Sequence, residues 1–154
     1  MHTVVLSTGS NIGDRENYLE SAKKKISEKI GEITKISSVY ETAPWGFKSK
    51  DNFLNQVLVC KTELEPLELL HQIHDIEKGL GKTETPRYSD EGERLYFSRV
   101  IDIDILFYDN HIIENENLII PHPHICMRDF VIMPLKEILP EFIHPVLNLK
   151  IKEL

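Results

Sequence analysis

Two aspartates, Asp102 and Asp104, have the spacing that most clearly suggests chemistry, and they stand in the run RVIDIDILF at residues 99–107. β-Branched residues dominate this run and its apolar residues recur with period two, which predicts a β-strand. A strand projects residues two apart to the same side, with about 7 Å between their Cα atoms. Carboxylate oxygens are the ligands that Mg²⁺ prefers, so the pair could hold metal ions against a polyphosphate.

The two faces of this predicted strand differ in polarity. The core face would consist of Ile101, Ile103, Ile105 and Phe107. The opposite face would carry both aspartates together with Val100 and Leu106. The alternative is a solvated edge strand whose charges prevent aggregation, which is the commoner role of an isolated D-x-D pattern. The surrounding isoleucines and Arg99, three residues before Asp102, favour the metal–phosphate interpretation.

A long polar stretch at residues 81–98 precedes the acidic strand and shows no apolar periodicity. Loops of this length in compact domains tend to be functional, and basic residues on one would suit a lid that closes on a nucleotide polyphosphate. We expect Lys82, just after the preceding helix, and Arg99, at the start of the acidic strand, to contact phosphate. For most other charges in this stretch a solvated loop is the simpler interpretation.

Aromatic and amide side chains flank another loop, at residues 43–51. Trp45, Phe53 and Asn55 could sandwich and hydrogen-bond a flat heterocycle at a junction of loop and strand. The alternative is that Trp45 and Phe53 are core aromatics, which is commoner.

His122, His124 and Arg128 form a second possible cationic group. The H-x-H spacing resembles a metal chelate, but no cysteine or third histidine lies nearby in the sequence. Polar contacts to a nucleotide are therefore favoured over zinc. Neither a P-loop nor a dinucleotide-binding glycine motif is present.

Composition limits the classes of function. The chain has 154 residues and a formal net charge of −7, so one domain over residues 1–154 is expected and a general nucleic-acid binder is not. No secretory signal and no apolar run of membrane-spanning length is visible, so a cytoplasmic protein without membrane partners is expected. Cys60 and Cys126 lack a C-x-x-C spacing and are interpreted as reduced core thiols.

Apolar patterns predict strands over residues 3–7, 33–42 and 53–63 besides the acidic strand, with a turn at residues 8–13. Asp14 is expected to cap a helix that ends at Gly31. Pro66 is expected in the first turn of a second helix, whose apolar face reaches Leu80. The resulting order β-α-β-β-α-β is typical of the ferredoxin-like α+β fold, an antiparallel sheet with both helices on one face.

A C-terminal extension follows this unit. Residues 111–113 and 118–120 could form a short hairpin after the turn at Asp109 and Asn110. Residues 126–139 hold two apolar clusters separated by Pro134, which predicts two short helices.

Together these segments resemble one family, the 6-hydroxymethyl-7,8-dihydropterin pyrophosphokinases of folate biosynthesis. The matching motifs are GSN at residues 9–11, YETAPWG at 40–46, FLN at 53–55, IE at 76–77, RVIDIDI at 99–105, PHPH at 121–124 and RDFV with PL at 128–135. The resemblance covers about residues 6–140. It implies the ferredoxin-like fold and transfer of the terminal pyrophosphoryl group of ATP to the pterin hydroxymethyl group, releasing AMP.

The resemblance also implies roles for individual residues. Asp102 and Asp104 would bind two Mg²⁺ ions and act in catalysis with Arg99 and Lys82. The residues implied to contact ATP are Lys82, Arg99, His122, Arg128, Glu77 and Tyr96. The residues implied to line the pterin pocket are Thr42, Ala43, Trp45, Phe53, Asn55, Phe130 and Asp102. Tyr96 stands where the family carries a tryptophan of its lid, near Arg94.

Two other functions remain open at this point. A metal-dependent phosphohydrolase could use Asp102 and Asp104 without a pterin, and a ferredoxin-like regulatory module could bind a small ligand at its sheet. The partners expected for the transferase are small molecules only, ATP and the hydroxymethyl-dihydropterin, acting on a monomer.

Overall fold

The computed structural model of the protein describes residues 1–43, 52–81, 87–88, 94–95 and 100–154. Its longer elements are β1 (His2–Ser10), α1 (Arg15–Lys29), β2 (Gly31–Ile36), β3 (Tyr40–Thr42), β4 (Phe53–Thr62), α2 (Pro66–Gly79), β7 (Asp102–Tyr108) and α3 (Asp129–Ile138). Its shorter elements are the strands β5 (Arg87–Tyr88), β6 (Arg94–Leu95), β8 (Ile113–Glu114) and β9 (Ile119–Ile120), with 3₁₀ turns η1 (Ile125–Met127) and η2 (Ile151–Glu153). None of the helices in these ranges is long and apolar enough to cross a lipid bilayer.

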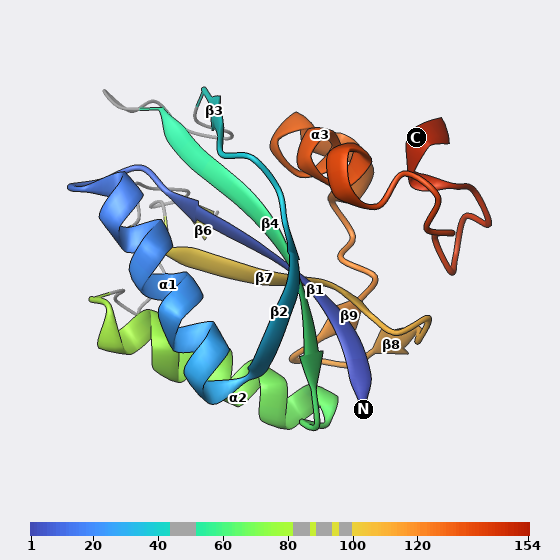
Figure 1. The fold of residues 1–154 in the computed structure, drawn as a ribbon, viewed down its shortest axis with the longest axis horizontal. Helices are drawn as coiled ribbons and strands as arrows, with labels where there is room; N and C mark the ends of the chain where they lie inside the picture. Colours follow the sequence, from blue (N-terminus) through green and yellow to red (C-terminus); the bar gives the residue numbers. More distant parts are fainter. Residues whose placement is uncertain (44–51, 82–86, 89–93, 96–99) are drawn as a thin grey trace.

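An antiparallel sheet separates two layers of the molecule. Its strand order is β2-β4-β1-β7, and β3 pairs with β4 beyond the end of β2. The helices α1 and α2 lie together on one face, whereas α3 and the C-terminal segment lie on the other (Figure 1). The strand order and the two helices on one face confirm the expected ferredoxin-like unit.

Both helices of this unit begin where the sequence predicts. Asp14 caps α1, because its side chain accepts a hydrogen bond of 3.2 Å from the backbone nitrogen of Asn17. Pro66 occupies the first turn of α2, where its missing N–H costs no helical hydrogen bond. The helices bury an apolar stripe that forms a first core with the sheet, namely Leu19, Ala22 and Ile26 on α1 and Leu69, Ile73 and Ile76 on α2.

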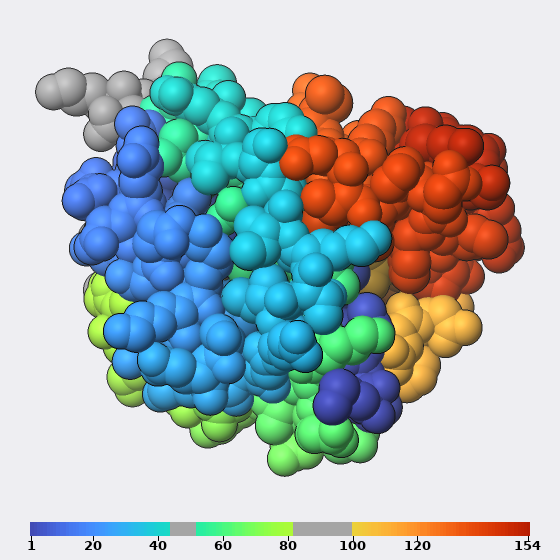
Figure 2. All heavy atoms as spheres, in the orientation of Figure 1, coloured from blue at the N-terminus to red at the C-terminus, as the bar shows by residue number. Residues whose placement is uncertain are grey.

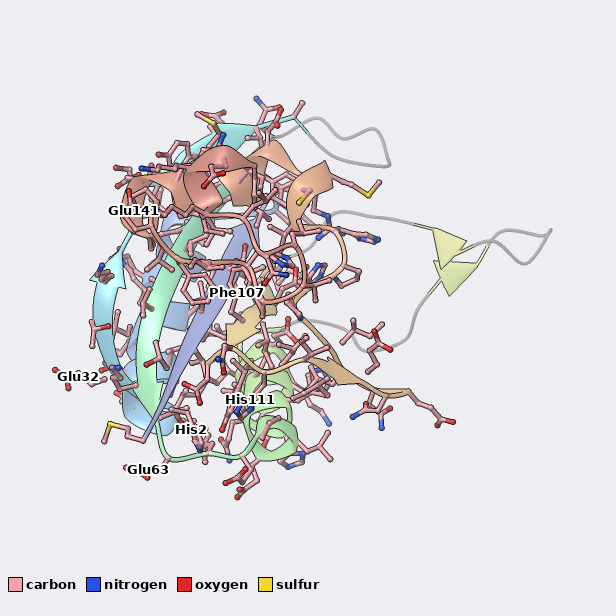
Figure 3. All side chains as sticks on the ribbon, turned by 90° about the vertical axis from the view of Figure 1, so that its right-hand side faces the viewer. His2, Glu32, Glu63, Phe107, His111 and Glu141 are labelled. Atoms are coloured by element: carbon pink, nitrogen blue, oxygen red, sulfur yellow. The ribbon has the colours of Figure 1, made fainter. Side chains whose placement is uncertain are left out.

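A second core fills the space between the sheet and the C-terminal extension. It joins Val5, Val57, Val59, Leu106 and Phe107 of the sheet to Ile125, Val131, Ile132, Leu135 and Ile151. The ring of Phe107 packs on that of Phe142, with 4.8 Å between centroids, and lies beneath the C-terminal segment in Figure 3. The extension therefore covers part of the face that α1 and α2 leave open.

A β-bulge in β7 makes one sequence prediction wrong. Val5 of β1 pairs with Phe107, but the next residue, Leu6, pairs with Ile105, so Leu106 is an extra residue in β7. A bulge of this kind resets the alternation of side chains. Phe107 consequently faces the second core rather than sharing the face of Ile105, and Tyr108 takes its place in the first core.

The strand boundaries also differ from those expected. Residues 8–10 belong to β1 rather than to a turn, because β4 pairs with them as far as Ser10. The strand predicted over residues 33–42 is two strands, β2 and β3. Ser37 separates them, since its hydroxyl accepts a 2.9 Å hydrogen bond from the backbone nitrogen of Val57 in place of a backbone carbonyl.

The prediction of two helices on either side of Pro134 is wrong, because α3 runs through this residue as one helix. Proline removes one helical hydrogen bond at a typical cost of about 3 kcal/mol. Val131, Ile132 and Leu135 are all buried in the second core, and this packing on both sides of Pro134 offsets the loss.

The remaining expectations are met in part. The hairpin after Asp109 is present as β8 and β9. Cys60 is buried and reduced as expected, but Cys126 is exposed and is not a core thiol. Within the predicted lid, the structure describes Gly81 and the paired backbones of β5 and β6, and the rest of the stretch lies outside the described residues.

Asp109 ties the end of β7 to the start of β1. Its carboxylate accepts a 2.8 Å hydrogen bond from the backbone nitrogen of Thr3 and lies 2.8 Å from Nδ1 of His2, which stands beside His111 in Figure 3. Burial alone would raise the pKa of Asp109, but these hydrogen bonds outweigh it and hold the pKa below its ordinary value. A carboxyl group of this kind stabilises the fold above its unfolded pKa, and the contribution is lost as the pH falls through the folded pKa.

The substitution Asp109→Asn tests this pH dependence, because asparagine also tolerates the backbone φ of 50° found there. We expect the free energy of unfolding at pH 7 to fall by about 1 kcal/mol and the difference from wild type to shrink below about pH 4. Urea unfolding at a series of pH values measures both. An equal difference at pH 7 and pH 3 would show that the charge of Asp109 is not responsible.

Candidate active site

The sheet face under α3 changes from apolar to polar along its strands. Side chains alternate between the two faces of the sheet, and Val5, Val57 and Leu106 point into the second core. The same face continues along these strands beyond the second core. There it presents Ser7 and Gly9 on β1, Phe53 and Asn55 on β4, and Asp102 and Asp104 on β7. Three strands thus contribute polar groups to one uncovered end of a face that is otherwise core.

Gly9 lies between the two sides of this polar region. It pairs with Asn55 of β4 on one side and with Asp102 of β7 on the other. A Cβ atom on Gly9 would lie 2.8 Å from Oδ1 of Asn55 and 3.7 Å from Cδ1 of Phe53. Glycine is therefore required to leave an open floor between Asn55 and Asp102. Sequence reasoning noted Gly9 only within a motif and did not count it among the site residues.

The β4 side of the floor brings together three residues expected to line the pterin pocket. Asn55 is only 3% exposed, and its Nδ2 donates a 3.0 Å hydrogen bond to Oγ1 of Thr42. Thr42 pairs across the strands with Phe53. The hydrogen bond fixes the orientation of the amide, which can donate and accept at one edge of a flat ligand. Ala43 follows at the exposed end of β3, and Trp45 lies outside the described residues.

The β7 side faces a polar cluster on the segment at residues 121–128. Oδ2 of Asp104 lies 3.7 Å from Nη1 of Arg128 and 4.0 Å from Nε2 of His122. Nη2 of Arg128 is 3.1 Å from Nδ1 of His124. The guanidinium also lies over the ring of Phe130, 5.5 Å from its centroid, at the start of α3. Arg128 therefore links the residue expected to stack on a pterin with one of the two expected metal ligands.

The surroundings of this cluster lower the pKa values of both of its histidines. Burial, Arg128 and His124 lower the pKa of His122 to about 4, against an opposing effect of Asp102. Burial and Arg128 also lower the pKa of His124. Nδ1 of His122 accepts a 3.1 Å hydrogen bond from the backbone nitrogen of His124, so the ring proton is on Nε2 and faces Asp104. The lowered pKa values favour the neutral form of both histidines, which can act as hydrogen-bonding groups beside the guanidinium of Arg128.

Glu77 supports the acidic strand from α2. It is 4% exposed, and its Oε2 accepts a 2.8 Å hydrogen bond from the backbone nitrogen of Ile103, the residue between the two aspartates. β7 is the last strand of the main sheet, and the backbone nitrogen of Ile103 is on its open edge, away from β1. Glu77 takes the place of a neighbouring strand and fixes the backbone that carries Asp102 and Asp104.

A cleft of about 460 Å³ unites the groups around β7. It is lined on its polar side by Glu77, Asp102, Asp104, His122, His124 and Arg128. On its other side it is lined by Leu70, His74, Ile105, Leu118 and Ile119. The structure thus brings together the described residues expected to contact ATP, while Lys82, Tyr96 and Arg99 lie outside the described ranges.

The two aspartates suit magnesium. In the part of the chain that the structure describes, no group of three or more His, Cys, Asp or Glu side chains could hold a metal ion. What the site does offer is a pair of carboxylates, those of Asp102 and Asp104, on one face of β7 and lining the cleft. Mg²⁺ is commonly held by one or two carboxylates together with phosphate oxygens and water, so this donor set fits that ion better than zinc.

The contribution of Arg128 to the lowered pKa of His122 can be measured. Arg128→Gln removes a positive charge next to the ring, so we expect the pKa of His122 to rise from about 4 toward its ordinary value. Arg128→Lys keeps a charge and is the control, for which we expect a smaller change. Proton NMR titration of the ring measures both. An unchanged pKa in Arg128→Gln would mean that the charge of Arg128 does not contribute to the value.

Comparisons with known proteins agree with this geometry. Residues 5–140 match the family described as 7,8-dihydro-6-hydroxymethylpterin-pyrophosphokinase (HPPK). The 2-amino-4-hydroxy-6-hydroxymethyldihydropteridine pyrophosphokinase of Aquifex aeolicus is 45% identical over 153 residues, covering 99% of this chain and 90% of the relative. The protein of the same name from Porphyromonas gingivalis is 41% identical over 146 residues, covering 94% of this chain and 95% of the relative.

A solved structure also shares the fold. The crystal structure of Plasmodium falciparum HPPK-DHPS with pteroate matches with a TM-score of 0.75 at 19% identity, covering 98% of this chain. This chain spans 43% of the length of that one. The resemblance inferred from the motifs is confirmed by these matches: the chain belongs to the 7,8-dihydro-6-hydroxymethylpterin-pyrophosphokinase family.

Proposed function

We propose that this chain transfers the terminal pyrophosphoryl group of ATP to the hydroxymethyl group of 6-hydroxymethyl-7,8-dihydropterin and releases AMP. ATP would occupy the cleft beside β7, and the pterin would lie over Gly9. The observation that carries the proposal is the pairing of Asn55, Gly9 and Asp102 across three neighbouring strands. Asn55 and Asp102 are two strands apart in this register, which corresponds to about 10 Å. The amide proposed to bind the pterin therefore lies close to a carboxylate proposed to bind metal and phosphate.

The pterin side of the site suits a flat, hydrogen-bonding ring. Asn55 offers an amide held in one orientation by Thr42, and Phe53 and Phe130 offer apolar ring surfaces. Gly9 leaves the space between them open. We include Ala43 and Trp45 in this pocket, Trp45 lying in the part that the structure does not describe.

The ATP side offers both charge and apolar surface. Arg128 can pair with phosphate oxygens, and the Nε2 proton of His122 can be donated to one. Leu70, Leu118 and Ile119 provide an apolar wall for a nucleotide base in the same cleft. We assign further phosphate or nucleotide contacts to Lys82, Arg99 and Tyr96, which lie outside the described residues, and to Glu77, which also orients β7.

The chemistry needs positioning and charge neutralisation more than a protein base. We propose that Asp102 and Asp104 hold two Mg²⁺ ions, which would lower the pKa of the attacking hydroxyl and offset charge on the transferred phosphates. His122 does not act as the base, because its Nδ1 lone pair is engaged by His124 and its Nε2 carries a proton. Arg128 and the metal-holding aspartates would therefore act by placing positive charge where the phosphates lie, and His122 by donating a hydrogen bond to them.

The proposal extends to the organisation of the protein. We treat residues 1–154 as one pyrophosphokinase domain that works as a monomer in the cytoplasm on two small molecules. The match over 90–95% of the length of two curated relatives supports the single domain.

The metal assignment is tested by Asp104→Ala. This side chain faces the cleft rather than a core, so the variant should fold normally. We expect its rate of AMP formation from ATP, Mg²⁺ and hydroxymethyl-dihydropterin to fall by about 10³-fold or more. A near-normal rate would remove Asp104 from the metal site.

The same assay without the pterin separates the other functions. A phosphohydrolase would consume ATP at the same rate with or without hydroxymethyl-dihydropterin. A regulatory module would bind ligand without turnover. The proposed transferase forms AMP and pterin diphosphate in equal amounts, and only when both substrates are present.

The open floor at Gly9 is tested by Gly9→Ala. A methyl group there would meet Oδ1 of Asn55, so we expect the affinity for the pterin to fall about tenfold or more while that for an ATP analogue changes little. Gly79→Ala is the matched control, since a Cβ at that position meets no atom within 4 Å. Calorimetric titration measures the affinity of each variant for the pterin and for the ATP analogue. Equal losses for both ligands would mean that Gly9 supports the fold rather than the pterin.

A further inference from the structure

A single carboxylate joins the far end of α3 to the edge of the sheet. Glu137 accepts hydrogen bonds from the backbone nitrogen of Ser38 at 2.9 and 3.1 Å, from Oγ of Ser38 at 3.1 Å and from the hydroxyl of Tyr40 at 2.6 Å. Nζ of Lys35 adds a 3.3 Å bond to the carbonyl of Ile138, the next residue. Figure 2 shows the two segments meeting at the surface, α3 in orange and residues around 40 in cyan.

Tyr40 lies in line with the three residues at the proposed pterin floor, Asn55, Gly9 and Asp102, which pair across neighbouring strands. It pairs directly with Asn55, so its side chain emerges on the same face as those of Asn55 and Asp102. Thr42, two residues further along β3, holds the amide of Asn55. The hydroxyl that reaches Glu137 is therefore carried by the strand that forms one wall of the pocket.

Glu137 and Phe130 lie on the same side of α3. They are seven residues apart in a continuous helix, which is close to two full turns and about 10 Å of rise. The helix thus carries the proposed stacking ring at one end and the anchoring carboxylate at the other. Any shift of the Glu137 end against β3 changes the position of Phe130 relative to Thr42 and Asn55.

The link consists of charge-assisted hydrogen bonds to an exposed carboxylate. Hydrogen bonds from Tyr40 and from the Ser38 backbone lower the pKa of Glu137, and the same bond to Glu137 raises the pKa of Tyr40. Exposed links of this kind add little to overall stability. The apolar side chains of α3 in the second core, Val131, Ile132 and Leu135, hold the helix to the sheet independently. The link is therefore better suited to setting an orientation than to holding the fold together.

We infer that Glu137 and Tyr40 are positioning residues for the pterin, which set the width of the slot between Phe130 on α3 and Thr42 and Asn55 on β3 and β4. This inference rests on the proposed function. Neither residue is placed in contact with ATP or with the reacting atoms. The pair acts through α3, whose first turn presents Phe130.

The experiment compares Tyr40→Phe, Glu137→Ala and the double variant. Tyr40→Phe removes one charge-assisted hydrogen bond, so we expect it to raise KM for hydroxymethyl-dihydropterin about tenfold, with little change in KM for ATP. Glu137→Ala also removes the bonds to Ser38, so we expect a rise at least as large, again confined to the pterin. The double variant should be no worse than the poorer single variant, because both changes remove one link. Glu137→Gln keeps an acceptor for Tyr40 and should recover most of the loss.

Glu141→Ala is the matched control. This glutamate also binds two partners, Lys150 at 2.9 Å and Lys152 at 2.8 Å, and both belong to the C-terminal residues rather than to β3. We expect its KM for the pterin to equal that of wild type. Thermal unfolding of every variant shows whether any change in KM merely follows a loss of stability.

Three results would overturn the inference. These are a wild-type KM for the pterin in Tyr40→Phe, an equal rise in Glu137→Ala and Glu141→Ala, or parallel rises in KM for both substrates together with a lower Tm. Failure of wild type to form pterin diphosphate would instead reject the proposed function. In that case, titration of pterin binding to the same variants still tests the positioning role.

Discussion

The pairing of β1 with strands on both of its sides is the constraint on which the site depends. β1 is central in the sheet, and its register aligns Asn55 with one side of Gly9 and Asp102 with the other. A shift of one residue in either pairing would move an entire set of side chains to the opposite face. The apolar pattern of the first core prevents such a shift, because Val4, Leu6, Leu58 and Ile105 must all face α1 and α2. Burial on one face of the sheet therefore fixes the chemistry on the other.

The C-terminal extension determines how much of that second face remains open. It covers the apolar ends of β1, β4 and β7 and stops where their side chains become polar. The bulge at Leu106 contributes to this arrangement, since it turns both Leu106 and Phe107 toward the extension. α3 then begins next to the uncovered region with Phe130, and the segment before it supplies Arg128 and His122. One packed layer thus forms the second core and a wall of the candidate site.

Charge in the site is arranged by burial as much as by sequence. Asp104 faces Arg128, whereas burial and the same arginine lower the pKa of His122 to about 4. The buried carboxyl group of Glu77 accepts a hydrogen bond from the backbone nitrogen of Ile103. It therefore orients the strand that carries the two aspartates from the edge of the sheet rather than from the face on which they lie. Among the described residues of the site, an arriving polyphosphate would meet the guanidinium of Arg128, the hydrogen-bonding ring of His122 and the two aspartates. Metal ions on the aspartates would add positive charge to this set. This balance agrees with a family of ATP-dependent pyrophosphokinases.

The sequence by itself determined the order of the elements in the ferredoxin-like unit, the residues at which its two helices begin and the shared face of Asp102 and Asp104. These features are local, because capping, turn chemistry and period-two alternation act over a few residues. Only the tertiary structure decided that β1 extends through Gly9, that Phe107 turns away from Ile105, that α3 passes through Pro134 and that the pKa values of His122 and His124 are lowered. Each depends on a neighbour distant in sequence: a paired strand, a bulge, a second core or a buried guanidinium. Local pattern could place the reactive residues on their elements, but only packing could place those elements around one site.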